Sequence, residues 1–226
     1  LPAVIILAII VLMVVLVIIL NDGTRKIPVQ YAQKVQGRRL VGGQSSSIPL
    51  KVNTAGVIPI IFAQSLLQFP LIISSFVKYN TAGVWAEVLK YLNSGNWCSL
   101  QQPKYTIGML VYIVLVIFFA YFYTSITFNP LMVADNMKKQ GGFIPGIRPG
   151  KPTSDYLTKV LNYVIFIGAV GLTIIGILPY IFNGIFKASV SFGGTSLIII
   201  VSVILETMKQ IESQMLVRNY KGFLND

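Results

Sequence analysis

This sequence of 226 residues contains no histidine, a single cysteine and only seven acidic side chains. A lone cysteine excludes a disulfide within the chain, and the absence of histidine removes the commonest metal ligand. The motifs of catalysis are missing as well, since there is no glycine-rich phosphate loop, no HExxH, no GxSxG and no paired carboxylates. We therefore expect no enzyme activity, no catalytic residues, no metal and no cofactor.

Hydrophobic side chains are abundant, making up 54% of the chain, whereas charged side chains make up 11%. Five apolar stretches carry no charge, and each is close to the roughly 20 residues that a helix needs to cross a bilayer. They lie near 1–20, 57–77, 105–128, 160–182 and 188–205. This composition predicts an all-α polytopic membrane protein with five transmembrane helices.

The positive charge is unevenly distributed. Of the 18 Lys and Arg residues, 14 lie in the segments 21–56 and 129–159 and in the tail from residue 206. Because cytoplasmic loops carry an excess of Lys and Arg, these segments are predicted to be cytoplasmic and the N-terminus external. The predicted order is span 1–20, cytoplasmic basic loop 21–56, span 57–77, external segment 78–104, span 105–128, cytoplasmic loop 129–156, span 157–182, span 188–211 and cytoplasmic tail 212–226.

The sequence begins at Leu1 without methionine and is apolar from its first residue. It has neither the charged start nor the small-residue cleavage site of a signal peptide. We therefore expect a chain cut inside a larger protein.

The second span, 57–77, is too polar for a simple anchor. It holds Gln64 and Gln68, which are four residues apart, three serines, and two prolines, Pro59 and Pro70. The two glutamines fall on one helix face, and an amide that faces hydrocarbon without a partner is costly. We expect this face to contact protein or water, beside an aqueous path.

The basic loop 21–56 alternates apolar residues at Ile27, Val29 and Tyr31 before the turn residues Gln36-Gly37. Alternation around a glycine turn predicts a β-hairpin. Its cations could serve topology alone or could dock an acidic or phosphate-bearing partner, and both interpretations stay open. These cations are Arg25, Lys26, Lys34, Arg38, Arg39 and Lys51.

The external segment 78–104 has the pattern of a helix that lies on the membrane, with Trp85 and Trp97 at headgroup depth. Its apolar stripe consists of Val84, Trp85, Val88, Leu89 and Leu92.

In the cytoplasmic loop 129–156, Pro130 is suited to the first turn of a short helix and Gly141-Gly142 to its end. Beyond that helix, FIPGIRPGKP places Arg148 between two Pro-Gly pairs, which stiffen the turn. A stiffly held arginine can bind a partner at low entropic cost, although a surface arginine without a role is the alternative. Thr153 or Ser154 is expected to cap the next helix.

The last two spans carry glycines and bulky aliphatic residues. Gly168 and Gly171 predict close helix packing. The run from Leu197 to Val201 fits core or lipid contact, or a hydrophobic constriction that closes a pore. The five apolar stretches contain no Asp, Glu, Lys, Arg or His, and the final helix can continue beyond its stretch through Glu206. Since a coupled carrier keeps ionisable groups or broken-helix ion sites at mid-membrane, a passive conduit worked by a cytoplasmic partner is favoured.

Several long segments resemble the second half of bacterial SecY, the protein-conducting channel subunit of the Sec translocon. They are RKIPVQYAQKVQGRR, GGQSSSIPLKVNTAGVIPIIFAQSLLQFP, FNPLMVADNMKKQGGFIPGIRPG and FGGTSLIIIV. The resemblance covers essentially Arg25 to the tail. It implies a ten-helix inverted-repeat channel in the bacterial plasma membrane, of which this chain would form one half, helices six to ten.

The resemblance also implies roles by position. The span 57–77 would be one side of a lateral gate for signal peptides and nascent chains, with gate residues Gln64, Ser65, Gln68 and Phe69. Ile61 and Ile199 would belong to the pore ring. Docking of the SecA ATPase or the ribosome would use Arg148, Lys151, Arg38, Arg39 and Lys51. The implied partners are SecE, SecG, the lipid bilayer and the N-terminal half of the same protein. A secondary transporter of a small solute and a purely structural membrane scaffold are the alternatives from other classes.

Overall fold

The computed structural model describes residues 2–31, 34–36, 39–41, 45–76, 83–98, 103–186 and 194–222. The chain divides into two compact units. Unit 1 comprises Leu1–Asn21, Leu66–Leu110 and Ile174–Asp226, and unit 2 comprises Asp22–Ser65 and Val111–Thr173.

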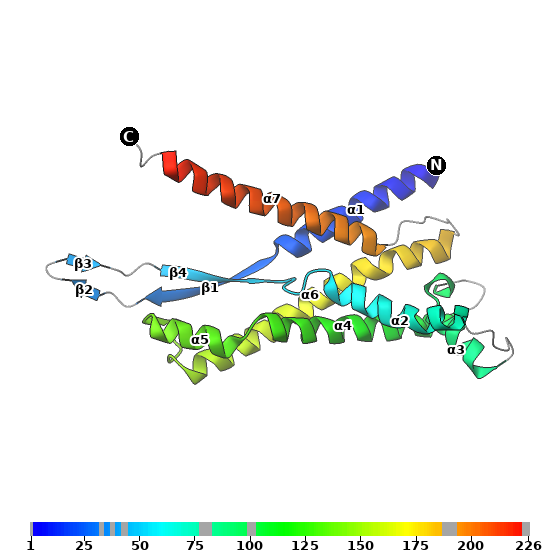
Figure 1. The fold of residues 1–226 in the computed structure, drawn as a ribbon, viewed down its shortest axis with the longest axis horizontal. Coiled ribbons are helices and arrows are strands. Elements are labelled where there is room, and N and C mark those ends of the chain that lie inside the picture. Colours follow the sequence, from blue (N-terminus) through cyan, green and yellow to red (C-terminus); the bar gives the residue numbers. More distant parts are fainter. Residues whose placement is uncertain are drawn as a thin grey trace. The chain divides into compact units, whose positions relative to one another are not determined.

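The described chain is mostly helical (Figure 1). The α-helices are α1 (Pro2–Asp22), α2 (Ile58–Phe76), α3 (Val84–Leu92), α4 (Ile107–Thr127), α5 (Pro130–Lys139), α6 (Lys151–Phe186) and α7 (Gly194–Gly222), and the 3₁₀ turns are η1 (Ser94–Asn96) and η2 (Pro103–Thr106). The strands are β1 (Thr24–Tyr31), β2 (Lys34–Gln36), β3 (Arg39–Val41), β4 (Ser45–Lys51) and β5 (Gly142–Phe143).

Three helices of the described chain are long and apolar enough to cross a membrane. They are Ile58–Phe76, Pro103–Lys139 and Lys151–Phe182, and the described apolar helix Leu7–Asp22 is shorter. The three coincide with the predicted spans 57–77, 105–128 and 157–182. The count of five spans stays a prediction.

The ends of two helices differ from the predicted boundaries. Helix α6 begins at Lys151 and runs for 36 residues, so it extends beyond the predicted span 157–182 at both ends. Helix α7 continues to Gly222, and the stretch 212–222, which we expected to be tail, is helical. At 1.5 Å per residue the 29 residues of α7 reach about 43 Å, longer than the roughly 30 Å of bilayer hydrocarbon.

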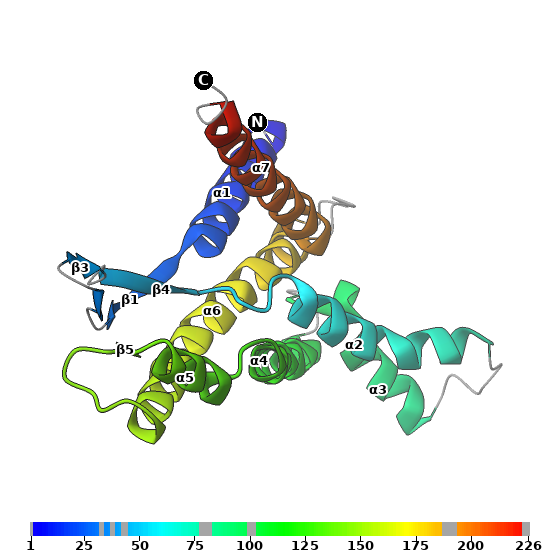
Figure 2. The same ribbon diagram turned by 60° about the vertical axis from the view of Figure 1, so that its left-hand side comes forward.

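The predicted hairpin is confirmed, and Figure 2 shows it leading from α1 into α2. Strand β1 pairs antiparallel with β4 in a register that places Ile27 opposite Ile48. Nearer the tip, β2 pairs with β3, with Gln36 opposite Arg39. The structure adds β5, which joins the free side of β1 and completes a three-stranded sheet in the order β4-β1-β5.

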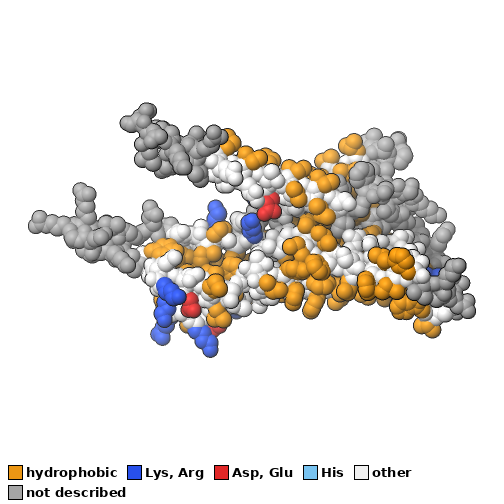
Figure 3. Space-filling view, viewed as in Figure 1, with side chains coloured by type: hydrophobic (Ala, Val, Ile, Leu, Met, Phe, Trp, Pro, Cys, Tyr) orange, Lys and Arg blue, Asp and Glu red, His pale blue; other side chains and the backbone are white. Residues whose placement is uncertain are grey.

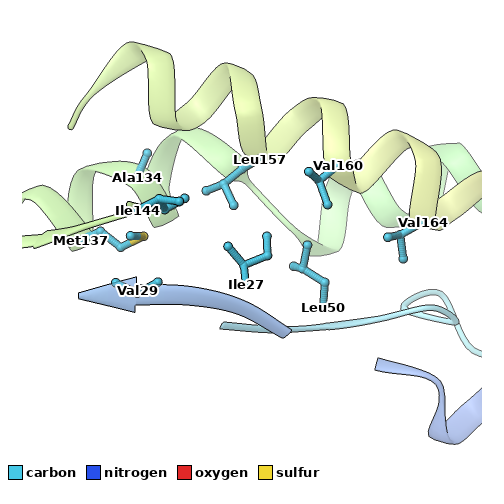
Figure 4. Packing of buried hydrophobic residues seen from close by; sticks show 9 residues of the cluster. All are labelled: Ile27, Val29, Leu50, Ala134, Met137, Ile144, Leu157, Val160 and Val164. Atoms are coloured by element: carbon cyan, nitrogen blue, oxygen red, sulfur yellow. The ribbon is translucent and has the colours of Figure 1, made fainter. Parts of the chain in front are cut away.

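The hairpin packs on α5 and α6 through a hydrophobic core within unit 2 (Figure 4). Alternation along β1 buries Ile27 and Val29 and leaves Lys26, Pro28 and Gln30 exposed. The core consists of Ile27, Val29, Leu50, Ala134, Met137, Ile144, Leu157, Val160 and Val164. Because burying one such aliphatic side chain fully is worth about 1.5–3 kcal/mol, this core holds the hairpin against the two helices.

The helix predicted after Pro130 is confirmed as α5. The side chain of Asn129 caps it by accepting hydrogen bonds from the backbone N–H groups of Leu131 (3.1 Å) and Met132 (3.3 Å). Gly141, which follows the helix, has a φ of +71°, a conformation that glycine adopts without strain.

One predicted local role in α6 is wrong. Thr153 and Ser154 do not cap the helix, because it starts before them and both are buried inside its first turns. The Thr153 hydroxyl instead donates a 2.8 Å hydrogen bond to the carbonyl of Arg148. Gly168 allows close packing, and the atoms nearest to it belong to Val52, after β4. The predicted helix packing at Gly168 and Gly171 stays a prediction.

In unit 1, the side chain of Trp97 is buried against protein, and its predicted headgroup depth in the membrane stays a prediction. Its side chain is only 2% exposed, and its indole N–H donates a 2.8 Å hydrogen bond to the carbonyl of Tyr91. The ring of Tyr180 packs edge-on against it, with centroids 5.1 Å apart. Because the indole N–H has a protein partner, burial of Trp97 is compatible with its polar atom.

Candidate functional site

Helix α2 has two chemically different faces. Ile60, Ala63 and Leu67 form the buried face, at the spacing of one helix side. The opposite face is exposed in the described chain and mixes apolar with polar side chains. It holds Ile61, which is 38% exposed, Ser65, Gln68 and Phe69, which is 63% exposed, whereas Gln64 is half-buried. Four of the five residues predicted on this helix therefore share one open face.

The serines of α2 do not need an aqueous path. The Ser65 hydroxyl donates a 2.7 Å hydrogen bond to the Ile61 carbonyl, one turn earlier in the same helix. Ser74 and Ser75 make the same kind of bond, to Leu71 and Ile72. A serine hydroxyl can donate its hydrogen bond to a carbonyl of its own helix. The serines therefore do not indicate whether this face contacts water. Of the polar side chains of α2, only the two glutamines thus indicate a polar environment.

The two predicted pore-ring residues lie in different units. Ile61 is in the part of α2 that belongs to unit 2, and Ile199 is a half-buried residue of α7 in unit 1. Their common role in a pore ring stays a prediction.

The loop that carries Arg148 is tightly turned. The backbone N–H of Ile147 donates a 3.0 Å hydrogen bond to the carbonyl of Ile144, and Gly146 within this turn has a φ of +83°. Pro145 and Gly146 occupy the central positions, as a type II turn requires. The Arg148 side chain is exposed, while its carbonyl is held by the Thr153 hydroxyl. The loop is therefore fixed through its backbone and leaves the guanidinium available.

The other predicted docking cations are distributed along the hairpin and the start of α6. Lys51 ends β4 and Lys151 begins α6, and both side chains are exposed. Arg39 begins β3, and Arg38 lies outside the described residues. Figure 3 shows Lys and Arg side chains gathered over the part of unit 2 that contains α5 and the start of α6. The exposed cations there are Lys138, Lys139, Arg148 and Lys151.

The structure joins the two basic projections in one unit, which the sequence did not predict. Strand β5, which follows α5, pairs with the end of β1 by placing Gly142 opposite Tyr31 and Phe143 opposite Gln30. A side chain at Gly142 would collide with the Tyr31 ring, since a Cβ there would lie 2.9 Å from Cε1. The glycine pair 141–142 was the only feature of the sequence that could have indicated this strand pairing. It was interpreted only as the end of a helix. Chemically, the unit offers a fixed array of cations suited to an acidic surface.

A family model described as SecY matches residues 1–208. The chain is 47% identical over 215 residues to the protein translocase subunit SecY of Mycobacterium leprae, covering 92% of this chain and 48% of the relative. It is 50% identical over 212 residues to the subunit of the same name from Streptomyces coelicolor, covering 92% and 46%. The chain thus spans about half the length of the curated relatives it matches.

Solved structures have the same fold. One, described as the structure of a protein conducting channel, aligns with a TM-score of 0.58 at 19% identity, covering 91% of this chain and 48% of the other. Another concerns the plug domain of the SecY protein and aligns with a TM-score of 0.60, also at 19% identity, over 91% of this chain and 48% of that one. At this identity the likeness concerns the fold alone.

Proposed function

We propose a function for this chain from one premise: the chain belongs to the SecY family. It forms one half of a protein-conducting channel that passes unfolded secretory proteins across the membrane and releases membrane helices sideways. The other half is the N-terminal half of the same protein, and the channel lies in the bacterial plasma membrane. The observation that carries this proposal is the mixed face of α2, directly connected to a cationic unit. We predict from its positive charge that this unit lies on the cytoplasmic side.

Helix α2 is the moving wall of a lateral gate. Gln64, Ser65, Gln68 and Phe69 line the gate, and Ile61 with Ile199 contributes to the ring that seals the pore at rest. A face that combines glutamines with large apolar residues suits alternate contact with neighbouring helices and with a passing chain. The prolines support this role, because Pro70 lies inside α2 and removes one backbone hydrogen bond of the helix. Such a helix separates from its neighbours at lower cost than a uniformly apolar one.

Unit 2 is the docking platform for the cytoplasmic partner. Arg148 and Lys151, together with Arg38, Arg39 and Lys51 of the hairpin, bind an acidic surface of the SecA ATPase or of the ribosome. SecE and SecG complete the assembly in the membrane. Because the Arg148 loop is held by backbone hydrogen bonds, little conformational entropy is lost when a partner binds the guanidinium.

Cross-linking of a stalled precursor tests the channel function. Single cysteines replace Ile61 or Gln64 in the full-length protein, in a Cys98→Ser background that removes the only native thiol of this chain. A secretory precursor arrested in transit should cross-link to both positions.

Two control positions make the result specific. A cysteine at Ala63, on the buried face of α2, should not label, and one at Ile167, an exposed residue of α6, reports non-specific contact. Labelling at Ala63 and Ile167 without labelling at Ile61 or Gln64 would contradict the channel function. The secondary transporter and the structural membrane scaffold would then remain as the possible functions.

A further inference from the structure

The connection between the hairpin and α2, residues 52–57, is held at several points although it contains no regular structure. The backbone N–H of Val52 donates a 2.8 Å hydrogen bond to the carbonyl of Gly23, and the Thr54 hydroxyl donates a 2.7 Å bond to the carbonyl of Lys51. Asn53 is only 9% exposed, and Ala55 is also buried. The connection is therefore packed into unit 2 over most of its length.

Small side chains of α4 and α6 form the surface that receives this connection. Ala120 and Thr124 come from α4, and Gly168 and Ala169 come from α6, and all four line one pocket with the connection. Thr124 is buried, and its hydroxyl donates a 2.8 Å hydrogen bond to the carbonyl of Ala120 in its own helix. Since that hydroxyl is satisfied locally, the pocket can receive backbone without competition from it. We call these four residues the seat.

Gly168 determines how closely the connection approaches α6. A Cβ built on Gly168 would overlap the backbone carbonyl of Val52, while the Val52 Cγ1 atom would lie at an ordinary 3.6 Å. The conflict is with backbone, which no side-chain rotation relieves. In both ribbon views the connection passes beside α6 (Figure 1, Figure 2). Among the twenty residues only glycine allows this contact without a shift of the connection.

Gly56 behaves differently from the residues before it. Its φ is +64°, and a Cβ there would meet nothing within 4 Å. The packed part of the connection therefore ends at Ala55. Gly56, which has a left-handed backbone conformation and free space beside its Cα, lies just before the first turn of α2. That turn is already helical in its bonding, because the Ile61 N–H donates a 3.2 Å hydrogen bond to the Val57 carbonyl.

We propose that Gly168 is a positioning residue: by admitting the Val52 carbonyl against α6, it anchors the connection in the seat, and α2 pivots at Gly56 relative to this anchor. The inference rests on the proposed gate function of α2 and adds the element that sets its resting position. The hairpin base then stays fixed to α4 and α6 while α2 moves. Loosening the seat frees α2 at rest, so the channel leaks without a precursor.

The test measures the distance between the hairpin and α2 directly. Spin labels are placed at Ser47, exposed on β4, and at Leu66, exposed on α2, in the full-length channel reconstituted in lipid with Cys98→Ser. Gly168→Ala should shift or broaden the distance distribution of the resting channel and raise its resting ion conductance severalfold. Asn53→Ala removes buried side-chain atoms from the connection and does not overpack it. It should change the distance distribution and the resting conductance in the same direction as Gly168→Ala, but by less.

Gly108→Ala is the matched control. Gly108 is a buried helical glycine of α4 in unit 1, where a Cβ would overlap the carbonyl of Tyr91, so the substitution does comparable local damage away from the seat. Its distance distribution should equal that of the parent channel. Unchanged distributions in both Gly168→Ala and Asn53→Ala, or an equal change in Gly108→Ala, would overturn the proposal.

The conductance separates this proposal from the function on which it rests. A changed distance with an unchanged resting conductance, in a channel that does conduct when a precursor is added, refutes the positioning role. If the parent channel never conducts with a precursor, the channel function fails, whereas the distance distributions still decide whether Gly168 anchors the connection.

Discussion

Replacing Ile27 by alanine tests whether the hairpin and the Arg148 loop form one body. Ile27 is 2% exposed and lies in the core between β1, α5 and α6. The substitution removes three buried carbon atoms, worth roughly 2 kcal/mol in transfer free energy, and the cavity brings the expected loss to about 2–5 kcal/mol. Because each 1.4 kcal/mol is about tenfold in an equilibrium constant, the population with a detached hairpin should rise at least about 30-fold.

Hydrogen exchange followed by mass spectrometry measures this detachment in the full-length protein. Amides of β1 and β4 should exchange faster by about the same factor, because local opening limits their exchange. Amides of β5 should accelerate together with them, since β5 is paired to the end of β1. Ser46→Ala is the control, because Ser46 is exposed on β4 and contributes no buried surface.

Two results would refute the reasoning behind this prediction. Unchanged exchange in β1 and β4 would mean that the buried core does not hold the hairpin. Faster exchange in β1 and β4 with unchanged exchange in β5 would mean that the two basic projections are independent, and the single docking platform would have to be abandoned.

Further predictions concern the docking loop and the gate. Arg148→Glu should weaken binding of the cytoplasmic partner about tenfold or more, most strongly at low salt, and should stop secretion at unchanged protein abundance, because the reversed charge opposes an acidic surface. The same reversal at Lys159, exposed on α6 beyond the loop, is the control, and normal secretion by Arg148→Glu would disprove the docking role. Gln64→Leu combined with Gln68→Leu should lower the open fraction in single-channel recordings about tenfold, since burying an amide in the closed gate costs about 1–3 kcal/mol that leucine does not incur. An unchanged open fraction would show that these glutamines do not influence opening.

The elements with a strong local signal were predictable from the sequence. Alternation at Ile27 and Val29 predicts the hairpin, and Pro130 with Gly141 predicts the bounds of α5, because strand period, helix caps and left-handed glycines are set by neighbouring residues. The same is true of the apolar helix α2. These features were read correctly because the interactions that produce them lie within a few residues of each other.

Only the tertiary structure decided which distant segments meet. The pairing of Gly142 with Tyr31, the burial of Trp97 and the contact of Gly168 with Val52 each join residues whose partners no local pattern names. Trp97 fits an interfacial belt by its position in the sequence, but a carbonyl six residues earlier satisfies its N–H and allows burial. The sequence by itself determined the membrane class, the helices and the hairpin through local periodicity and composition. Strand pairing, the hydrophobic core and the contact of Gly168 with the Val52 backbone determined how the hairpin, the Arg148 loop and the start of α2 are joined in one unit.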